Sequence, residues 1–284
     1  IAEENFEVDF NSVYRIGLTD PDPEVRAAAI DGIWEDNDTA LIAPLIRFLQ
    51  QDSTESVRAA AATGLGQFVL SGEYEEIPPA KIEPVLDALR STYLKESESL
   101  EVRRRALESL AYHTFDELPG FIRTAYEHSN ERMRSGAVQA MGRSSDEQWS
   151  DIVVRELEST NPEMRFEAAQ ACGGLEIPAA VKPLIELIED VDDQVQKAAV
   201  WALGEIGGEA ARRALTAVLD SDQDYLHEAA EDALAELDFN SGNLAFKVLD
   251  FDDVDTVDEV DEDEEWLMDR VDEDEEDDES ALDN

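Results

Sequence analysis

A histidine followed directly by glutamate can bind a transition metal, and the chain carries one such His-Glu pair, His227 and Glu228. The two remaining histidines, His113 and His128, lie far from this pair in sequence. A two-metal carboxylate site needs several such ligands that converge. We therefore expect no metal site, and we interpret His227 as a solvated or packing histidine.

The sequence contains no recognisable motif of a catalytic nucleophile or of a phosphate-binding loop. Cys172 is the single cysteine, so the chain forms neither an internal disulfide nor a cysteine-based zinc site. The motifs GxSxG, GxxxxGK(S/T), HExxH and CxxC do not occur. The sequence thus predicts no catalytic residue and no cofactor. The lone cysteine fits a reducing compartment, so we expect a cytoplasmic protein, although the chain begins at Ile1 and a removed targeting segment stays an alternative.

The charge of the chain restricts its partners. The formal net charge is −48, and nucleic acids are polyanions, so extensive binding to a phosphate backbone is electrostatically opposed. No run of about 18 apolar residues is present, so we expect no membrane span. We therefore expect a monomer that binds a protein, favouring a basic one, rather than nucleic acid or membrane.

The elements that would position any site come from an internal repeat. Seven segments share an apolar residue, which we call the marker, usually followed by arginine. The last four intervals between markers are 31 residues each. The markers are Val25, Val57, Val102, Met133, Met164, Val195 and Leu226.

Every marker is followed four residues later by alanine. The residue at position seven after the marker is always small, and the residue at position eight is always apolar. Positions 0, 4, 7 and 8 lie on one face of an α-helix, and small residues on that face let a neighbouring helix approach closely. The alanines are Ala29, Ala61, Ala106, Ala137, Ala168, Ala199 and Ala230.

A second helical pattern precedes each marker segment, so each repeat is predicted to be a helical hairpin. A hairpin with one apolar face cannot bury that face alone, and stacking builds a continuous core. We therefore predict an all-α solenoid of about seven hairpins over residues 1–240. The predicted first helices are 6–18, 39–49, 82–94, 118–126, 147–157, 180–188 and 210–219.

The second and third markers are 45 residues apart. The additional residues include Ser71, Gly72, Pro78 and Pro79, a composition typical of loops. We therefore expect a surface loop inserted between these two repeats.

The repeat resembles the HEAT repeat, and more narrowly its short subtype named after phycobilisome lyases. The resemblance covers residues 5–237 and implies a right-handed α-solenoid. The matching residues are Asp20, Val25 and Arg26; Asp52, Val57, Arg58, Leu65 and Gly66; and Asp190, Val195, Leu203 and Gly204.

The same resemblance implies several functions. Such repeats serve scaffolds and a few enzymes, so fold alone does not decide between them. We favour a non-enzymatic interaction scaffold or adaptor. The alternative is a bilin lyase-like enzyme, and a di-iron hydroxylase with repeated His-Glu ligands is disfavoured because the chain has one such pair. A HEAT-like DNA glycosylase is opposed by the charge.

Arginines follow five of the markers, and in the family such arginines pair with the motif aspartate of their own or an adjacent repeat. This structural role is favoured over a basic binding stripe. We call this set of arginines the arginine column. Gln196 and His227 stand at its position in the last two repeats, and Ser97, His128 and Ser159 stand where other repeats have the motif aspartate. The arginines are Arg26, Arg58, Arg103, Arg134 and Arg165.

The second helices of HEAT arrays line a concave surface, and helical geometry then points positions two and six after the marker into the groove. The middle repeats carry aromatic and hydrogen-bonding groups there, which is typical of protein-binding surfaces. The alternative for Trp201 and Phe166 is packing between helices. The predicted partner-binding residues are Arg104, Glu108, Ser135, Gln139, Phe166, Gln170, Lys197 and Trp201.

The C-terminal residues 241–284 form an acidic tail that we expect to be largely disordered, because dense like charge prevents folding. From Asp238 onward, 22 acidic residues stand against Lys247 and Arg270. Residues 244–251 are apolar enough to cap the last repeat, and Trp266, Leu267 and Met268 suggest a linear motif that orders on binding. The tail is either a solubilising appendage or an arm that recruits basic proteins. Acidity of the whole chain also fits adaptation to high salt.

Overall fold

The computed structural model describes residues 10–34 and 36–240. The expectations for the acidic tail, including the cap at 244–251 and the motif Trp266, Leu267 and Met268, lie outside the described residues. All described residues belong to one compact unit.

The described residues form helices joined by short turns, in seven successive hairpins. Short 3₁₀ turns at Thr39–Leu41, Glu147–Trp149 and Pro178–Ala180 lead into three of the first helices. The first helices are α1 (Asn11–Gly17), α3 (Ile42–Gln51), α5 (Pro79–Leu94), α7 (Leu118–Tyr126), α9 (Ser150–Glu156), α11 (Val181–Leu187) and α13 (Gly208–Leu219). The second helices are α2 (Pro23–Gly32), α4 (Glu55–Glu73), α6 (Leu100–Leu110), α8 (Glu131–Arg143), α10 (Pro162–Gly174), α12 (Asp193–Ile206) and α14 (Asp224–Asn240).

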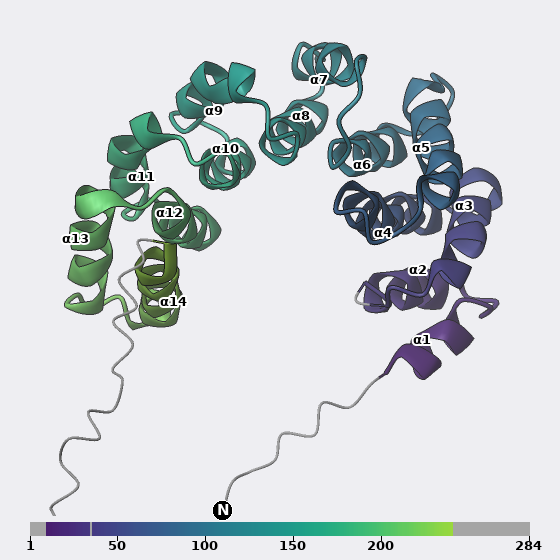
Figure 1. The fold of residues 1–284 in the computed structure, drawn as a ribbon, viewed down its shortest axis with the longest axis horizontal. Coiled ribbons are helices and arrows are strands. Elements are labelled where there is room, and N and C mark those ends of the chain that lie inside the picture. The colour runs from purple at the N-terminus through teal and green to yellow at the C-terminus, as the bar shows by residue number, and fades with distance from the viewer. Residues whose placement is uncertain (1–9, 35, 241–284) are drawn as a thin grey trace, which may run out of the picture. The chain divides into compact units, whose positions relative to one another are not determined.

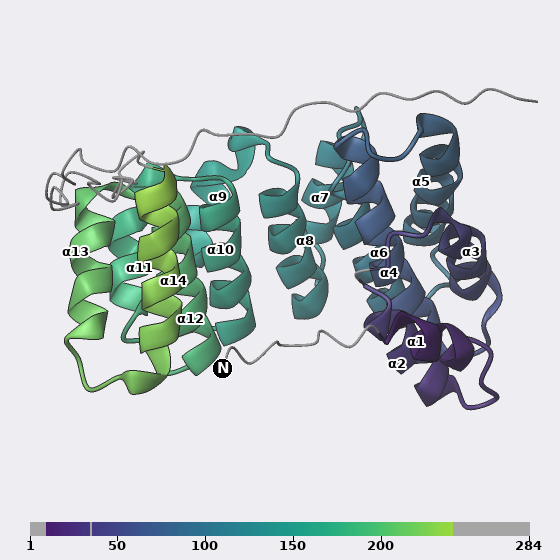
Figure 2. The ribbon, with the colours of Figure 1, turned by 60° about the horizontal axis from the view of Figure 1, so that its bottom comes forward.

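Within this unit the hairpins stack so that the second helices form an inner row and the first helices an outer row (Figure 1). Each second helix packs on the second helices before and after it. Seen from the side, α8, α10, α12 and α14 stand nearly parallel (Figure 2). The all-α solenoid of seven hairpins predicted from the repeat is confirmed, and residues at equal repeat positions are brought into register along the inner row.

Side-chain caps set the starts of the second helices. The side chains of Asp22, Asn130, Asn161 and Asp192 each accept a hydrogen bond from a backbone N–H of the first helical turn. Such bonds satisfy donors that would otherwise lack an intrahelical partner. Proline at the first position of α2 and α10 costs nothing there, because that N–H is not needed by the helix.

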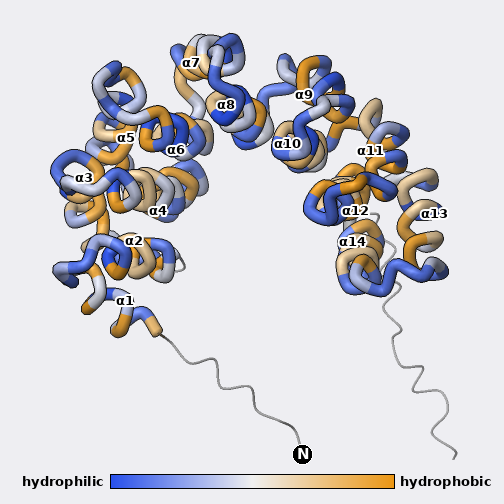
Figure 3. The backbone as a smooth tube through the Cα atoms, turned by 180° about the vertical axis from the view of Figure 1, so that it is seen from behind, coloured by the Kyte–Doolittle hydropathy of each residue, from blue (hydrophilic) through white to orange (hydrophobic). Residues whose placement is uncertain are grey.

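The predicted helix face forms the core. All seven repeat alanines are buried, as are six of the seven markers, whereas Val25 at the edge of the array is exposed. Hydrophobic and hydrophilic stretches alternate along the helices, as expected for helices buried on one side (Figure 3). None of the described helices combines the length and the hydrophobicity needed to cross a membrane.

The arginine column links neighbouring repeats at three positions. In each case the guanidinium forms an ion pair with an acid in the turn between the two helices of the next hairpin, as the family resemblance implies. Glu98 takes this role where Ser97 replaces the motif acid. The pairs are Arg26–Asp52 at 2.9 Å, Arg58–Glu98 at 2.8 Å and Arg165–Asp190 at 2.7 Å.

Gln196 and His227 replace the arginine in the last two repeats, but each keeps a side-chain contact that the arginine makes, to the backbone carbonyl six residues earlier. The Nη1 of Arg165 donates to the carbonyl of Ser159, six residues earlier, at 2.9 Å. Gln196 Nε2 donates in the same way to the carbonyl of Asp190, at 2.6 Å. His227 Nε2 lies 3.1 Å from the Ser221 carbonyl, again six residues earlier. His227 therefore packs against its own hairpin turn, which matches its structural interpretation.

The expected loop between the second and third repeats is shorter than predicted. Ser71 and Gly72 belong to the last turn of α4, which has 19 residues, and Pro79 is the first residue of α5. The prediction of a loop over these residues was wrong because Phe68 and Val69 are buried and extend the packed face of α4. Most of the additional residues thus lengthen two helices, which leaves the turn at 74–78.

Candidate partner-binding groove

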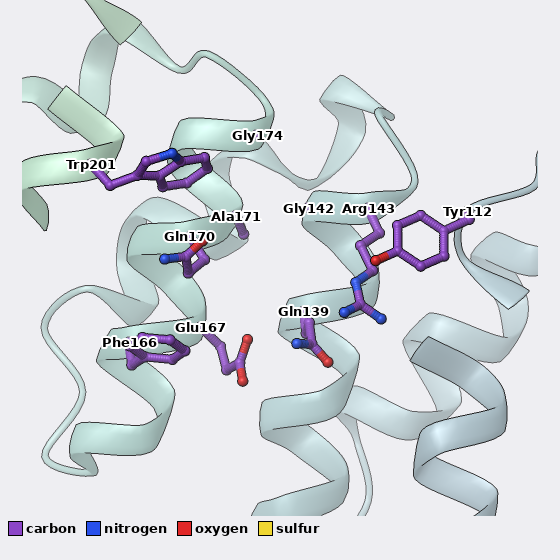
Figure 4. Close-up of a pocket in the computed structure, with 10 residues that line it drawn as sticks. All are labelled: Tyr112, Gln139, Gly142, Arg143, Phe166, Glu167, Gln170, Ala171, Gly174 and Trp201. Atoms are coloured by element: carbon purple, nitrogen blue, oxygen red, sulfur yellow. The ribbon is translucent and has the colours of Figure 1, made fainter. Parts of the chain in front are cut away.

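A cavity of about 410 Å³ opens on the inner row at α8, α10 and α12 (Figure 4). We call it the central pocket. Tyr112, just beyond the end of α6, closes one side of it, and Trp201 of α12 closes the other. The lining residues are Tyr112, Gln139, Gly142, Arg143, Phe166, Glu167, Gln170, Ala171, Gly174 and Trp201.

Four of the eight predicted partner-binding residues meet in this pocket. Gln139, Gln170 and Trp201 occupy position six of three successive repeats, and Phe166 occupies position two of the middle one. Equal repeat positions recur side by side because the hairpins stack in register. An aromatic and amide surface is thereby assembled from residues that are 31 positions apart in sequence.

The two aromatic side chains are partly packed and partly exposed. Trp201 is 37% exposed, and its ring lies against Gly173, where an added Cβ would come within 2.6 Å of Cζ3 of the indole. Phe166 is half-buried and contacts the hydrophobic core. These side chains therefore combine packing between helices with exposure at the pocket.

Arg104 and Glu108 differ from the expectation, because both are buried between α6 and α8. They form an ion pair at 2.9 Å, and Arg104 also pairs with Glu101 at 2.7 Å. The two helices approach closely at Gly136, where an added Cβ would lie 2.5 Å from Cγ of Arg104. The absence of a side chain at this position makes room for the ion pair and removes both residues from the groove surface.

Ser135 and Lys197 also lie outside the central pocket. Ser135 is fully buried, and its hydroxyl donates to the backbone carbonyl of Glu131 at 3.2 Å, as serine commonly does within a helix. The close packing of α6 on α8 leaves it no access to a partner. Lys197 is exposed on α12.

Sequence reasoning missed Glu167, which lines the pocket from α10. Its side chain is buried, and its carboxyl group points toward Gln139 across the pocket (Figure 4). Burial raises the pKa of this carboxyl to about 7, and the negative charges of Glu108 and Glu163 add to the effect. A signal was present in the sequence: position three after the marker is acidic in this repeat alone, and alanine, glycine or arginine elsewhere.

Arg143 and Tyr112 also line the pocket, and the sequence did not predict either of them as a site residue. Arg143 donates to the backbone carbonyl of Glu108 at 3.0 Å, and its guanidinium lies 4.6 Å from the centre of the Tyr112 ring. These contacts hold the Arg143 side chain on the α6 side of the pocket. The charge of Arg143 opposes the rise in the pKa of Glu167, but within the described part of the chain it acts at a distance and not through a hydrogen bond to that carboxylate.

The Gln139 amide connects the pocket to the buried ion pair. Oriented to satisfy its neighbours, its nitrogen donates to the two carboxylate oxygens of Glu108 at 3.2 and 3.1 Å. The carbonyl oxygen of the same amide then remains as an acceptor. The central pocket therefore presents acceptors and aromatic rings together, a combination suited to a positively charged group.

The His227–Glu228 pair shows no metal-binding arrangement. Over residues 10–34 and 36–240, no three or more His, Cys, Asp and Glu side chains are grouped so that they could hold a metal ion.

Solved structures share this architecture at low sequence identity. The complex of CpcE and CpcF of phycocyanin lyase from Nostoc matches with 17% identity, 84% of this chain and 97% of that chain covered, and a TM-score of 0.51. Human deoxyhypusine hydroxylase in complex with glycerol matches with 19% identity, 81% and 84% covered, and a TM-score of 0.42. At 17% identity the first match shows the fold alone, and the TM-score of the second is too low to support any conclusion.

Sequence comparison gives the family. No curated protein sequence matches the chain. A family model for HEAT repeats matches residues 15–93 and 150–235, more than half of the chain and six of the seven hairpins at least in part. Together with the seven stacked hairpins, this match establishes that the chain belongs to the HEAT repeat family.

Proposed function

We propose that this chain is a non-enzymatic scaffold that binds a partner protein in the groove of its inner helix row, centred on the central pocket. The observation that carries the proposal is the convergence of Gln139, Phe166, Gln170 and Trp201 from three successive repeats on one cavity. Aromatic side chains flanked by amides are the usual anchors of protein interfaces, and stacked repeats typically present such surfaces.

A basic protein is the partner that the charge of the chain favours. The net charge of −48 attracts a cationic surface and opposes nucleic acid. We further propose that the acidic residues 241–284 raise the rate of association with such a partner. Long-range attraction of this kind weakens as salt screens it, with a Debye length of about 10 Å at 0.1 M.

Candidate partners can be found by affinity purification and mass spectrometry, with the full chain and a variant lacking residues 252–284 as baits. For each candidate, the dissociation constant is measured for the unchanged protein and for Phe166→Ala/Trp201→Ala. We expect the double variant to bind at least tenfold more weakly, because it removes both aromatic anchors.

The matched control is Tyr74→Ala, which removes an exposed aromatic side chain at the end of α4, outside the pocket. The control should bind as the unchanged protein does. Equal affinity in the double variant, or a loss of affinity that follows from a collapse of its thermal stability, would refute the groove. An association rate at low salt that does not depend on residues 252–284 would refute the role of the acidic segment.

A bilin lyase-like enzyme is the alternative that the family resemblance implies. The likeness to phycocyanin lyase concerns the fold alone. Absorbance spectra of the protein mixed with a linear tetrapyrrole discriminate between the two functions, and the scaffold proposal expects no spectral change.

A further inference from the structure

We propose that the central pocket accepts an arginine side chain of the partner, with its guanidinium group against Glu167 and Gln139 and its stem along Trp201. This inference rests on the proposed function, since it names the group by which the partner protein is recognised.

The first observation is an unpaired buried carboxylate. Glu167 is 8% exposed and lines the cavity, and within the described residues Arg143 and Arg104 act on its carboxylate through their charge alone, without a hydrogen bond. A buried charge without a partner is costly, whereas a cation that enters the pocket would offset the cost. An anionic or purely apolar occupant would not offset this cost.

The charged groups around Glu167 leave this role to an outside cation. On α6, Arg104 is held by Glu101 and Glu108. On α8, Arg143 donates to the Glu108 carbonyl and lies over Tyr112. On α10, Glu163 is acidic as well, and α12 contributes the uncharged Trp201 to the lining. Both internal arginines therefore already have partners.

Arginine suits the remaining features of the pocket better than lysine does. Its planar guanidinium has five donors, which match a carboxylate and a neighbouring amide oxygen, and it stacks on aromatic faces. Glu167 supplies acceptors from α10 and the reoriented amide of Gln139 supplies one from α8, while Trp201 supplies a partly exposed ring. A lysine ammonium would use the carboxylate but gain less from a planar arrangement.

The occupancy of the pocket should depend on pH. Burial together with Glu108 and Glu163 raises the pKa of Glu167 to about 7, against the opposing charges of Arg143 and Arg104. The guanidinium binds the ionised carboxylate. Affinity should therefore rise about tenfold from pH 6 to pH 8, as the ionised fraction of Glu167 rises.

The test uses a capped Gly-Gly-Arg-Gly-Gly peptide and the same peptide with citrulline, an uncharged analogue of arginine, or lysine. Binding is followed by the NMR signal of the Trp201 indole N–H, assigned by its loss in Trp201→Phe. We expect the arginine peptide to shift this signal saturably, at least tenfold more tightly than the citrulline peptide. Glu167→Gln should abolish the response, whereas Glu163→Gln, an exposed acid one turn away, should keep it.

Equal binding of the citrulline peptide, or an unchanged response in a folded Glu167→Gln, would overturn the inference. Equal binding of the lysine peptide would overturn the choice of arginine. The pH dependence is measured on the unchanged protein, so it does not rely on a variant that folds. If partner capture is lost in Phe166→Ala/Trp201→Ala but kept in Glu167→Gln, the proposed function stands and this inference fails; if both variants capture the partner, both fail.

Discussion

At the scale of single residues, Glu167 combines a cost in stability with a candidate role in recognition. The other two buried carboxylates among the described residues, Asp36 and Glu108, each form an ion pair with an arginine. Glu167 has neighbours of both signs, but burial dominates and its pKa is raised to about 7. Such a group destabilises the native state wherever it must ionise.

Replacement of Glu167 by glutamine should therefore stabilise the free protein at pH 8. The pKa of this group lies near 4.5 ordinarily and near 7 in the folded chain, so the folded state loses stability as pH rises through this interval. We expect Glu167→Gln to raise the free energy of unfolding at pH 8 by about 1 to 3 kcal/mol and to have little effect near pH 4. Urea titrations at both pH values measure this, and a variant less stable than the unchanged protein at pH 8 would contradict it. Glu163→Gln serves as the exposed control.

At the scale of helices, ion pairs and glycines determine how closely neighbouring hairpins stack. Arg165 pairs with Asp190 of the next repeat through both Nε and Nη2, at 2.7 Å each. Arg134, at the same repeat position, donates to the carbonyls of His128 and Ser129, and its ion pair in the described part of the chain is with the exposed Glu131 of its own helix. The two arginines therefore differ in how strongly they couple adjacent repeats.

Arg165→Ala should destabilise the array by about 2 kcal/mol, because it leaves the poorly exposed Asp190 without its cation. Burial alone would raise the pKa of Asp190, but Arg165 and the backbone N–H of Asp192 hold it below its ordinary value. The stabilisation is thus present at neutral pH and is lost as pH falls through that lowered pKa. Arg134→Ala should cost less than half as much in the same urea titration, and equal effects would contradict this role.

Gly173 controls the contact between α10 and α12. A Cβ at this position would lie 2.6 Å from the Trp201 ring and 3.0 Å from Cα of Ala202, so the backbone of α12 would have to shift. We expect Gly173→Ala to lower stability by about 1 to 3 kcal/mol and to move the Trp201 indole signal.

Gly120 in α7 is the matched control for that substitution. A Cβ there meets nothing within 4 Å, so Gly120→Ala should instead stabilise the protein by about 0.5 to 1 kcal/mol. Thermal melts measure both variants. A change in melting temperature of the same sign for Gly173→Ala and Gly120→Ala would contradict the role of Gly173 in packing.

At the scale of the whole molecule, the net charge of −48 opposes the compact state. Screening of this repulsion should raise the melting temperature as KCl increases from about 10 mM to 1 M. Scanning calorimetry measures the effect, and sorbitol at matched osmolality controls for exclusion of solutes. A melting temperature that does not depend on salt would contradict a major role for self-repulsion. A steep further rise at molar KCl would support adaptation to high salt, and it would then weaken any inference about partners from charge alone.

The sequence by itself determined the architecture and the groove positions at which Gln139, Phe166, Gln170 and Trp201 lie. Helical periodicity is local, and 31-residue repeats must place equal positions side by side once they stack. The tertiary structure alone decided which groove positions stay accessible. The missing side chain at Gly136 lets α6 and α8 bury Arg104 and Glu108, and packing of Phe68 and Val69 turns a predicted loop into helix. It also decided that Glu167 is buried beside the pocket without an ion pair among the described residues, because burial depends on distances between helices that periodicity does not encode.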